Sequence, residues 1–133
     1  MRGANLIVSD EQGGPRMQIP NPDEVWVERA KILESLLNRE HPDGQSKAKF
    51  FEQYGFRQSQ WRRLADALRN QARRSEGTAV RESSHGTRYV VEGPIETPTG
   101  DRPEGRTVWI VERNQSEPGP RLVTAYPRSS SGR

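Results

Sequence analysis

The hydrophobic positions divide the chain into a helical first half and a strand-rich second half. Asp23 can cap a first helix, and a short second helix follows in residues 48–54 and ends at Gly55. A third helix opens at Ser59. Apolar residues at helical spacing form the stripe of the first helix at Trp26, Ala30, Leu33 and Leu37, and that of the third at Trp61, Leu64, Ala65, Leu68 and Ala72.

From Thr87 onward the apolar period changes from that of a helix to that of a strand. Three β-rich runs, 87–95, 106–112 and 120–127, are separated by turn-forming clusters, which is typical of an antiparallel meander. Alternation places Thr107, Trp109 and Val111 on one face of the second run, where Trp109 is expected to be core. It places Leu122, Thr124 and Tyr126 together on one face of the third. The pattern predicts an α+β fold of three N-terminal helices followed by a three- to four-stranded meander.

Composition limits the folded part to one domain. Of the 133 residues, 30% are hydrophobic and 29% charged, which is polar for a chain that folds throughout. We expect a disordered tail or linker over residues 1–18, a single domain over 19–127 and a disordered tail over 128–133. The net charge of +3 favours a polyanionic partner only weakly, and the lack of cysteine excludes disulfides. No apolar run is long enough for a membrane span, and residues 1–20 lack a signal-peptide core.

A joint between the first two helices carries the strongest chemical signal. Pro42 and Gly44 interrupt the helical pattern around His41, whose imidazole exchanges a proton near neutral pH. Lys47 and Lys49 follow in the first turn of the next helix, where the helix dipole disfavours a cation. A bound anion would relieve this conflict, so the joint predicts a phosphate site.

No metal-ligand cluster, phosphate-binding loop, nucleophile elbow or cofactor motif is present in the sequence. The remaining His, Lys, Arg, Thr and Tyr side chains suffice for RNA cleavage without a metal, in which a 2′-hydroxyl attacks the adjacent phosphate. In this hypothesis His41 is a base or an acid, while Lys47 and Arg88 hold phosphate oxygens. Thr124 and Tyr126 contribute hydroxyl groups from one strand.

The motifs LLN-x2-HP-x-G-x2-KA-x-FF, GT-x-Y, TVWI and LVTAYP extend over roughly residues 17–127. In these motifs the chain resembles a small bacterial domain of unknown function that occurs alone and as the C-terminal domain of polymorphic toxins. Its element order is similar to that of barnase-like and colicin-ribonuclease-like toxins. The resemblance implies an RNA substrate, a cognate immunity protein or antitoxin, and action in the cytoplasm, its own or that of a target cell after secretion within a larger toxin.

By the same resemblance, the five candidate site residues occupy motif positions. His41 and Lys47 lie in the HP and KA positions, and Arg88 in GT-x-Y, where other members often have lysine. Thr124 and Tyr126 lie in the closing strand motif.

Two other classes of function also fit the pattern. Residues 47–74 have the proportions of a helix-turn-helix, and a hairpin beginning at Tyr89 would be the wing of a DNA-binding winged helix. The arginines of the third helix would then contact phosphates, and their pairing with acids of the same chain would count against this alternative. A non-catalytic interaction or immunity-type protein is the other alternative.

Overall fold

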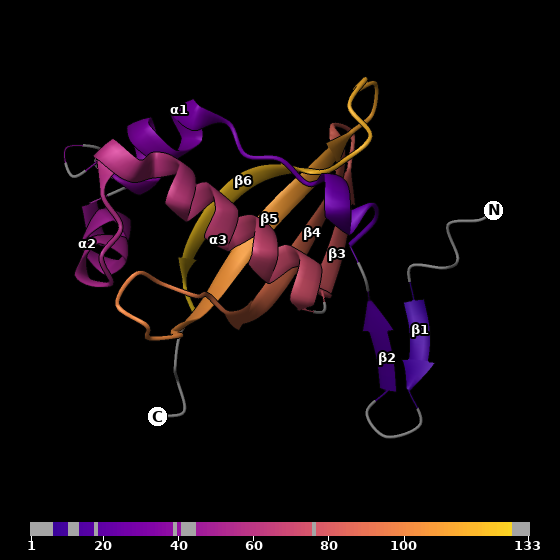
Figure 1. Ribbon diagram of the computed structural model, residues 1–133. Helices are drawn as coiled ribbons and strands as arrows, with labels where there is room; N and C mark the ends of the chain where they lie inside the picture. The colour runs from indigo at the N-terminus through magenta and orange to yellow at the C-terminus, as the bar shows by residue number, and fades with distance from the viewer. Residues whose placement is uncertain are drawn as a thin grey trace.

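Four consecutive strands form the main antiparallel sheet of the protein. They are β3 (Gly77–Ser83), β4 (Gly86–Pro94), β5 (Glu104–Glu112) and β6 (Arg121–Pro127), paired in sequence order (Figure 1). A hairpin of β1 (Ile7–Asp10) and β2 (Gly14–Met17) joins the β3 edge where Met17 pairs with Gly77. The computed structural model describes residues 7–10, 14–17, 19–38, 40, 45–75 and 77–128.

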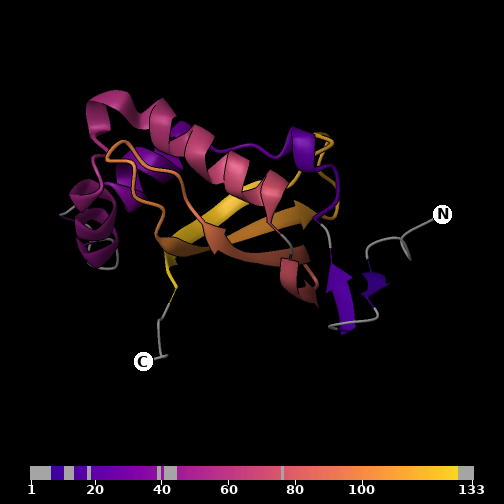
Figure 2. The same cartoon turned by 60° about the horizontal axis from the view of Figure 1, so that its bottom comes forward.

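The helices cover one face of this sheet. Helix α3 (Trp61–Arg74) crosses that face, and α1 (Arg29–Lys31), which continues as a π-helical segment over Ile32–Leu36, lies next to it. Helix α2 (Gln45–Gln53) stands at the β6 edge, and short 3₁₀ turns occupy Pro22–Glu24 and Gln58–Gln60. Figure 2 shows α1 and α3 on one side of the sheet and no helix of the described chain across the other. None of the described helices is long and apolar enough to cross a membrane.

The core lies between α3 and the helix-covered face of the sheet. The predicted stripe of α3 is buried at Leu64, Ala65, Leu68 and Ala72, whereas Trp61 is only partly buried. Trp109 is fully buried at the centre of β5, as expected, with Tyr89 and Leu122 paired to it on either side. Burial of this apolar surface is the main driving force for the fold.

A buried polar network connects α3 to β5 within this core. The indole Nε1 of Trp109 donates to Thr107 Oγ1 at 2.8 Å, and Thr107 Oγ1 donates to Gln71 Oε1 at 2.7 Å. The amide nitrogen of Gln71 in turn donates to the carbonyl oxygens of Gly105 and Gly93. Each polar group taken out of water therefore keeps a partner, which burial requires.

The first predicted helix begins later than the sequence pattern indicates. Trp26 lies in an extended segment, where its N–H donates to Pro120 O and its carbonyl oxygen accepts from Leu122 N–H, both at 3.0 Å. Because the backbone groups of Trp26 are bonded to the edge of β6, they are not available for helical hydrogen bonds. The π-helical bond from Leu37 N–H to Ile32 O then turns Ile32, Leu36 and Leu37 into the core, whereas Ala30 is exposed and Leu33 partly so.

The α+β class is confirmed, but the helices are not strictly N-terminal. Strands β1 and β2 precede them and lie within residues 1–18, the segment expected to be a tail or linker. Strand β3 is added to the three predicted strands. In the segment 128–133, Arg128 N–H donates to Glu104 O at 3.1 Å, and the remaining residues lie outside the described chain.

The predicted alternation in β6 is wrong at Leu122. The register of β6 against β5 shifts between Val108, opposite Thr124, and Trp109, opposite Leu122, which leaves Val123 as an extra residue. This β-bulge reverses the alternation. Leu122 and Ala125 consequently face the core, whereas Thr124 and Tyr126 face the other side of the sheet.

Candidate functional site

The face of the sheet away from α3, here called the open face, carries a band of charged and hydroxyl side chains. Strand pairing defines its membership, because residues opposite one another in adjacent strands share a face. Its members on β4, β5 and β6 are Arg88, Val90, Glu92, Arg106, Val108, Ile110, Arg121, Thr124 and Tyr126. Three of the five predicted site residues, Arg88, Thr124 and Tyr126, therefore lie on one face.

Helix α2 brings Lys47 to the edge of this open face. Ala48 and Phe51 are buried and anchor the helix, and Lys47 precedes them on the side turned to β6. The Lys47 ammonium group donates to Thr124 Oγ1 at 2.9 Å and lies 5.9 Å from the centre of the Tyr126 ring. Among the described residues Lys47 donates to no other acceptor, although an ammonium group has three donor hydrogens.

A row of three side chains continues this cluster across the sheet. Glu92 on β4, Arg106 on β5 and Tyr126 on β6 are paired side by side, with the Arg106 guanidinium carbon 5.8 Å from the centre of the Tyr126 ring. Arg106 donates from two nitrogens to the Glu92 carboxylate. The same carboxylate forms an ion pair with Arg128, whose Nε lies 3.4 Å from Glu92 Oε1. The Glu92 side chain is only 12% exposed, so this carboxylate fixes both guanidinium groups.

The hydrogen bonds of Arg106 stabilise its charged form. Its pKa is raised above the ordinary value, first by the hydrogen bond with Tyr126 and then by the bond with Glu92. A permanently charged guanidinium group thus lies beside the Tyr126 ring at the β6 edge. Lys47, Thr124, Tyr126, Arg106 and Glu92 are named the β6-edge cluster below.

Sequence reasoning missed Glu92 and Arg106. A usable signal was present, because the two residues lie equally far from residue 99, the middle of the loop between their strands. A hairpin closed symmetrically about that point would place them opposite one another.

Arg88 shares the open face but is not part of the β6-edge cluster. Arg88 is exposed and lies opposite Ile110 on β5. Ile110 is two residues further along β5 than Val108, which lies opposite Thr124. Two strand spacings, roughly 10 Å, separate β4 from β6. Among the described residues no carboxylate forms an ion pair with Arg88, so its charge is available to an anion that spans this distance.

His41 lies outside the described residues and stays a prediction. Lys49, its companion at the joint, is exposed on α2 beside Glu52, Gln53 and Arg57. Of the two lysines, Lys47 is the one that reaches the sheet.

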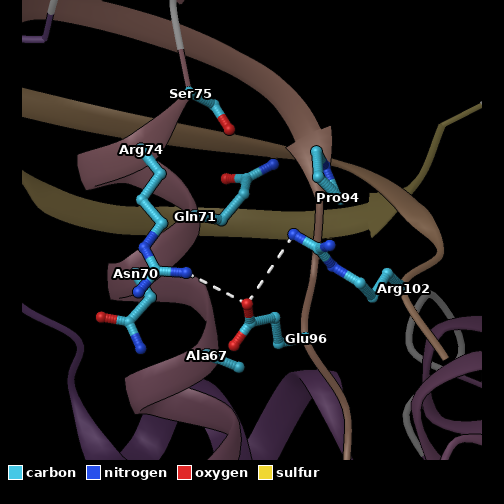
Figure 3. A pocket seen from close by; sticks show the side chains of 8 residues that line it. All are labelled: Ala67, Asn70, Gln71, Arg74, Ser75, Pro94, Glu96 and Arg102. Atoms are coloured by element: carbon cyan, nitrogen blue, oxygen red, sulfur yellow. Dashed lines mark hydrogen bonds and ion pairs between the residues drawn. The ribbon is translucent and has the colours of Figure 1, made fainter. Parts of the chain in front are cut away.

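A hollow on the helix-covered side of the sheet is separate from the predicted residues. It has a volume of about 190 Å³ and lies between α3 and the loop that follows β4. Figure 3 shows Arg74 and Arg102 both directed at Glu96. Their guanidinium nitrogens lie 3.0 Å and 3.7 Å, respectively, from the same oxygen, Glu96 Oε2. Asn70 and Gln71 line the same hollow.

No group of three or more His, Asp or Glu side chains able to hold a metal ion occurs within the described part of the chain. The open face carries the cations Arg88, Arg106 and Arg121. Arg121, at the other end of that face, is already paired with Glu28 and Glu112, at 3.6 and 2.7 Å.

Together these features define a small α+β domain with a cation-rich cluster at one edge of an open sheet face. The chain belongs to the family described as domain of unknown function DUF6883, whose model matches residues 18–129. This agrees with the resemblance seen in the sequence motifs over roughly residues 17–127. Neither the curated proteins nor the solved structures include a match to the chain.

Proposed function

We propose that this domain is a metal-independent ribonuclease that cleaves RNA at the β6-edge cluster. The observation that carries the proposal is the bond between Lys47 and Thr124, which holds an ammonium group beside Tyr126 and Arg106 on an open sheet face. Oriented cations of this kind stabilise the charge that develops on phosphate oxygens during transfer.

In the proposed reaction the 2′-hydroxyl of one nucleotide attacks the phosphorus that follows it. The bond from phosphorus to the 5′-oxygen breaks, leaving a 2′,3′-cyclic phosphate and a free 5′-hydroxyl. One group removes the proton of the 2′-hydroxyl, and another gives a proton to the leaving oxygen. We assign one of these proton transfers to His41, on the sequence evidence alone.

Each remaining residue has a role that follows from its place. Lys47 binds a non-bridging oxygen of the scissile phosphate, and Thr124 fixes Lys47. The Tyr126 ring lies beside both Lys47 and Arg106, and we assign its hydroxyl to the second proton transfer or to orienting the phosphate. Arg88 lies farther along the face and suits the phosphate of a neighbouring nucleotide.

The test is cleavage of a labelled RNA by the purified chain in the presence of a chelator. Lys47→Ala and His41→Ala should each lower the cleavage rate about 100-fold or more. Lys49→Ala is the matched control, because it removes the same charge two residues away on the same helix without touching the sheet. Intact RNA with the unsubstituted protein, or equal cleavage by all variants, would refute the proposal.

The toxin context extends this proposal through the family resemblance. We propose that the domain acts on RNA in the cytoplasm, of its own cell or of a target cell, and that a cognate immunity protein or antitoxin restrains it. Expression in bacteria should then arrest growth, and Lys47→Ala should relieve the arrest at an equal protein level.

The DNA-binding alternative receives less support. Arg69 pairs with Asp66 at 3.5 Å and Arg74 with Glu96 at 3.0 Å, both within this chain. The helix also packs along the sheet through its buried stripe, so only its outer side faces solvent.

A further inference from the structure

Helix α3 concentrates the positive charge of the protein. Its sequence, WRRLADALRNQARR, holds five arginines, one aspartate and no lysine, which is a net charge of +4. The whole chain has a net charge of +3, so the remaining residues together are close to neutral. A helix that carries all of the excess charge points to a local function for that charge.

The buried stripe of α3 faces the sheet, and its arginines therefore lie toward solvent. Figures 1 and 2 show α3 as the outermost element of the helical side. Arg62, Arg63 and Arg73 are exposed. At the rise of a helix, Arg62 and Arg73 are about 16 Å apart, a distance that covers several consecutive backbone phosphates.

Three of these arginines are not neutralised by the described part of the chain. Arg69 and Arg74 have carboxylate partners, whereas Arg62, Arg63 and Arg73 form no ion pair with any described carboxylate. Within that part of the chain, Arg73 donates only to the amide oxygen of Asn70, at 2.8 Å. Arg62 lies over the Trp61 ring, 5.0 Å from its centre.

We propose that the outer face of α3, formed by Arg62, Arg63 and Arg73, binds the backbone of single-stranded RNA without reading its sequence. Guanidinium groups bind phosphate oxygens in bidentate fashion, and RNA is the partner that the proposed ribonuclease already requires. Trp61 packs against the core at the start of the helix, and its ring lies under the Arg62 guanidinium group, which it helps to orient.

This surface lies on the opposite side of the sheet from the β6-edge cluster. A short RNA strand therefore occupies one surface, and a longer strand that passes around the domain occupies both. Linked binding of this kind raises affinity with length without any new contact. The inference shares the class of partner with the proposed ribonuclease, but it does not depend on cleavage.

The experiment measures binding of fluorescent 2′-O-methyl RNA, which lacks the attacking hydroxyl and cannot be cleaved. Oligomers of about 6 and about 24 nucleotides lie near the lower end and beyond the upper end of the usual site sizes of single-strand binding folds. The test variant combines Arg62→Ala, Arg63→Ala and Arg73→Ala. The control removes three charges elsewhere, with Arg57→Ala, Arg102→Ala and Arg113→Ala.

In the test variant the long oligomer should no longer bind more tightly than the short one. The slope of log affinity against log salt concentration should also be less steep by about 2, as expected for three lost phosphate contacts to a single strand. The control should keep most of that gain. A second test variant, with Gln at the same three positions, preserves side-chain length and guards against loss of folding, which thermal melting checks.

Unchanged affinity and salt dependence in both test variants would overturn the inference. Competition by polyglutamate as strong as that by unlabelled RNA would also overturn it, in favour of an acidic protein partner. If the protein binds RNA through α3 yet cleaves none, only the ribonuclease proposal fails.

Discussion

Lys47 on α2 donates a hydrogen bond of 2.9 Å to Thr124 on β6, a residue 77 positions away in the chain. The bond fixes a flexible cationic side chain against the one strand whose bulge turns two hydroxyl groups to the open face. A helix at the sheet edge and an irregular edge strand thus combine to form the β6-edge cluster.

Thr124→Val should separate this positioning effect from overall folding. Valine keeps the shape of threonine but accepts no hydrogen bond, so Lys47 loses its anchor. RNA cleavage should fall on the order of 10-fold, the scale of one hydrogen bond to a charged group. Thr124→Ser, which keeps the hydroxyl, should cleave at nearly the original rate. Equal rates for the two variants would show that the bond has no role in cleavage.

Thr107→Val should destabilise the core. The substitution leaves the Trp109 indole N–H and the Gln71 amide oxygen without their buried partner. The free energy of unfolding, measured by urea denaturation, should fall by about 1–3 kcal/mol. Thr87→Val, at a partly exposed position of β4, is the matched control and should change it far less.

Gly119→Ala tests the contact between the loop before β6 and the segment that precedes Trp26. A Cβ at residue 119 would collide with the backbone carbonyl group of Glu24, and backbone has little room to move aside. We expect a loss of roughly 2 kcal/mol or more in unfolding free energy, as for overpacked sites. Gly100→Ala meets no atom within 4 Å and bears only the cost of its φ of +92°. A smaller loss at Gly119 than at Gly100 would contradict the predicted collision.

Tyr89→Phe should change how stability depends on alkaline pH. Burial, and secondarily the negative charge of Glu82, raises the pKa of Tyr89 above its ordinary value near 10. The folded state therefore keeps its proton while the unfolded state releases it, and stability declines as pH rises above about 10 toward the folded-state pKa. Within that window the decline is at most about 1.4 kcal/mol per pH unit. Denaturation of the phenylalanine variant at a series of pH values should show a smaller decline.

Local spacing predicted much of the fold correctly. The α3 stripe, the end of α2 near Gly55 and the burial of Trp109 all depend on periodicity or on a single turn residue, which the sequence displays directly. The sequence allowed for a fourth strand but did not locate β3, because GTAVRES contains few apolar residues and its alternation is weak.

The candidate site was predictable only in part. Lys47, Thr124 and Tyr126 lie together, and Arg88 is on the same face, but the partners Glu92 and Arg106 were not identified. Those two residues become neighbours through strand register, which a search for motifs within short segments does not consider.

By itself, the sequence determined the α+β class, the helical and strand-rich halves, most of the core and the membership of the family. Only the tertiary structure decided that Trp26 pairs with β6, that the bulge at Val123 turns Thr124 and Tyr126 to the open face, and that Arg106 lies between Glu92 and Tyr126. The physical reason is common to all three. Each depends on hydrogen bonds between backbone segments far apart in sequence, and these bonds override local periodicity once the strands are paired.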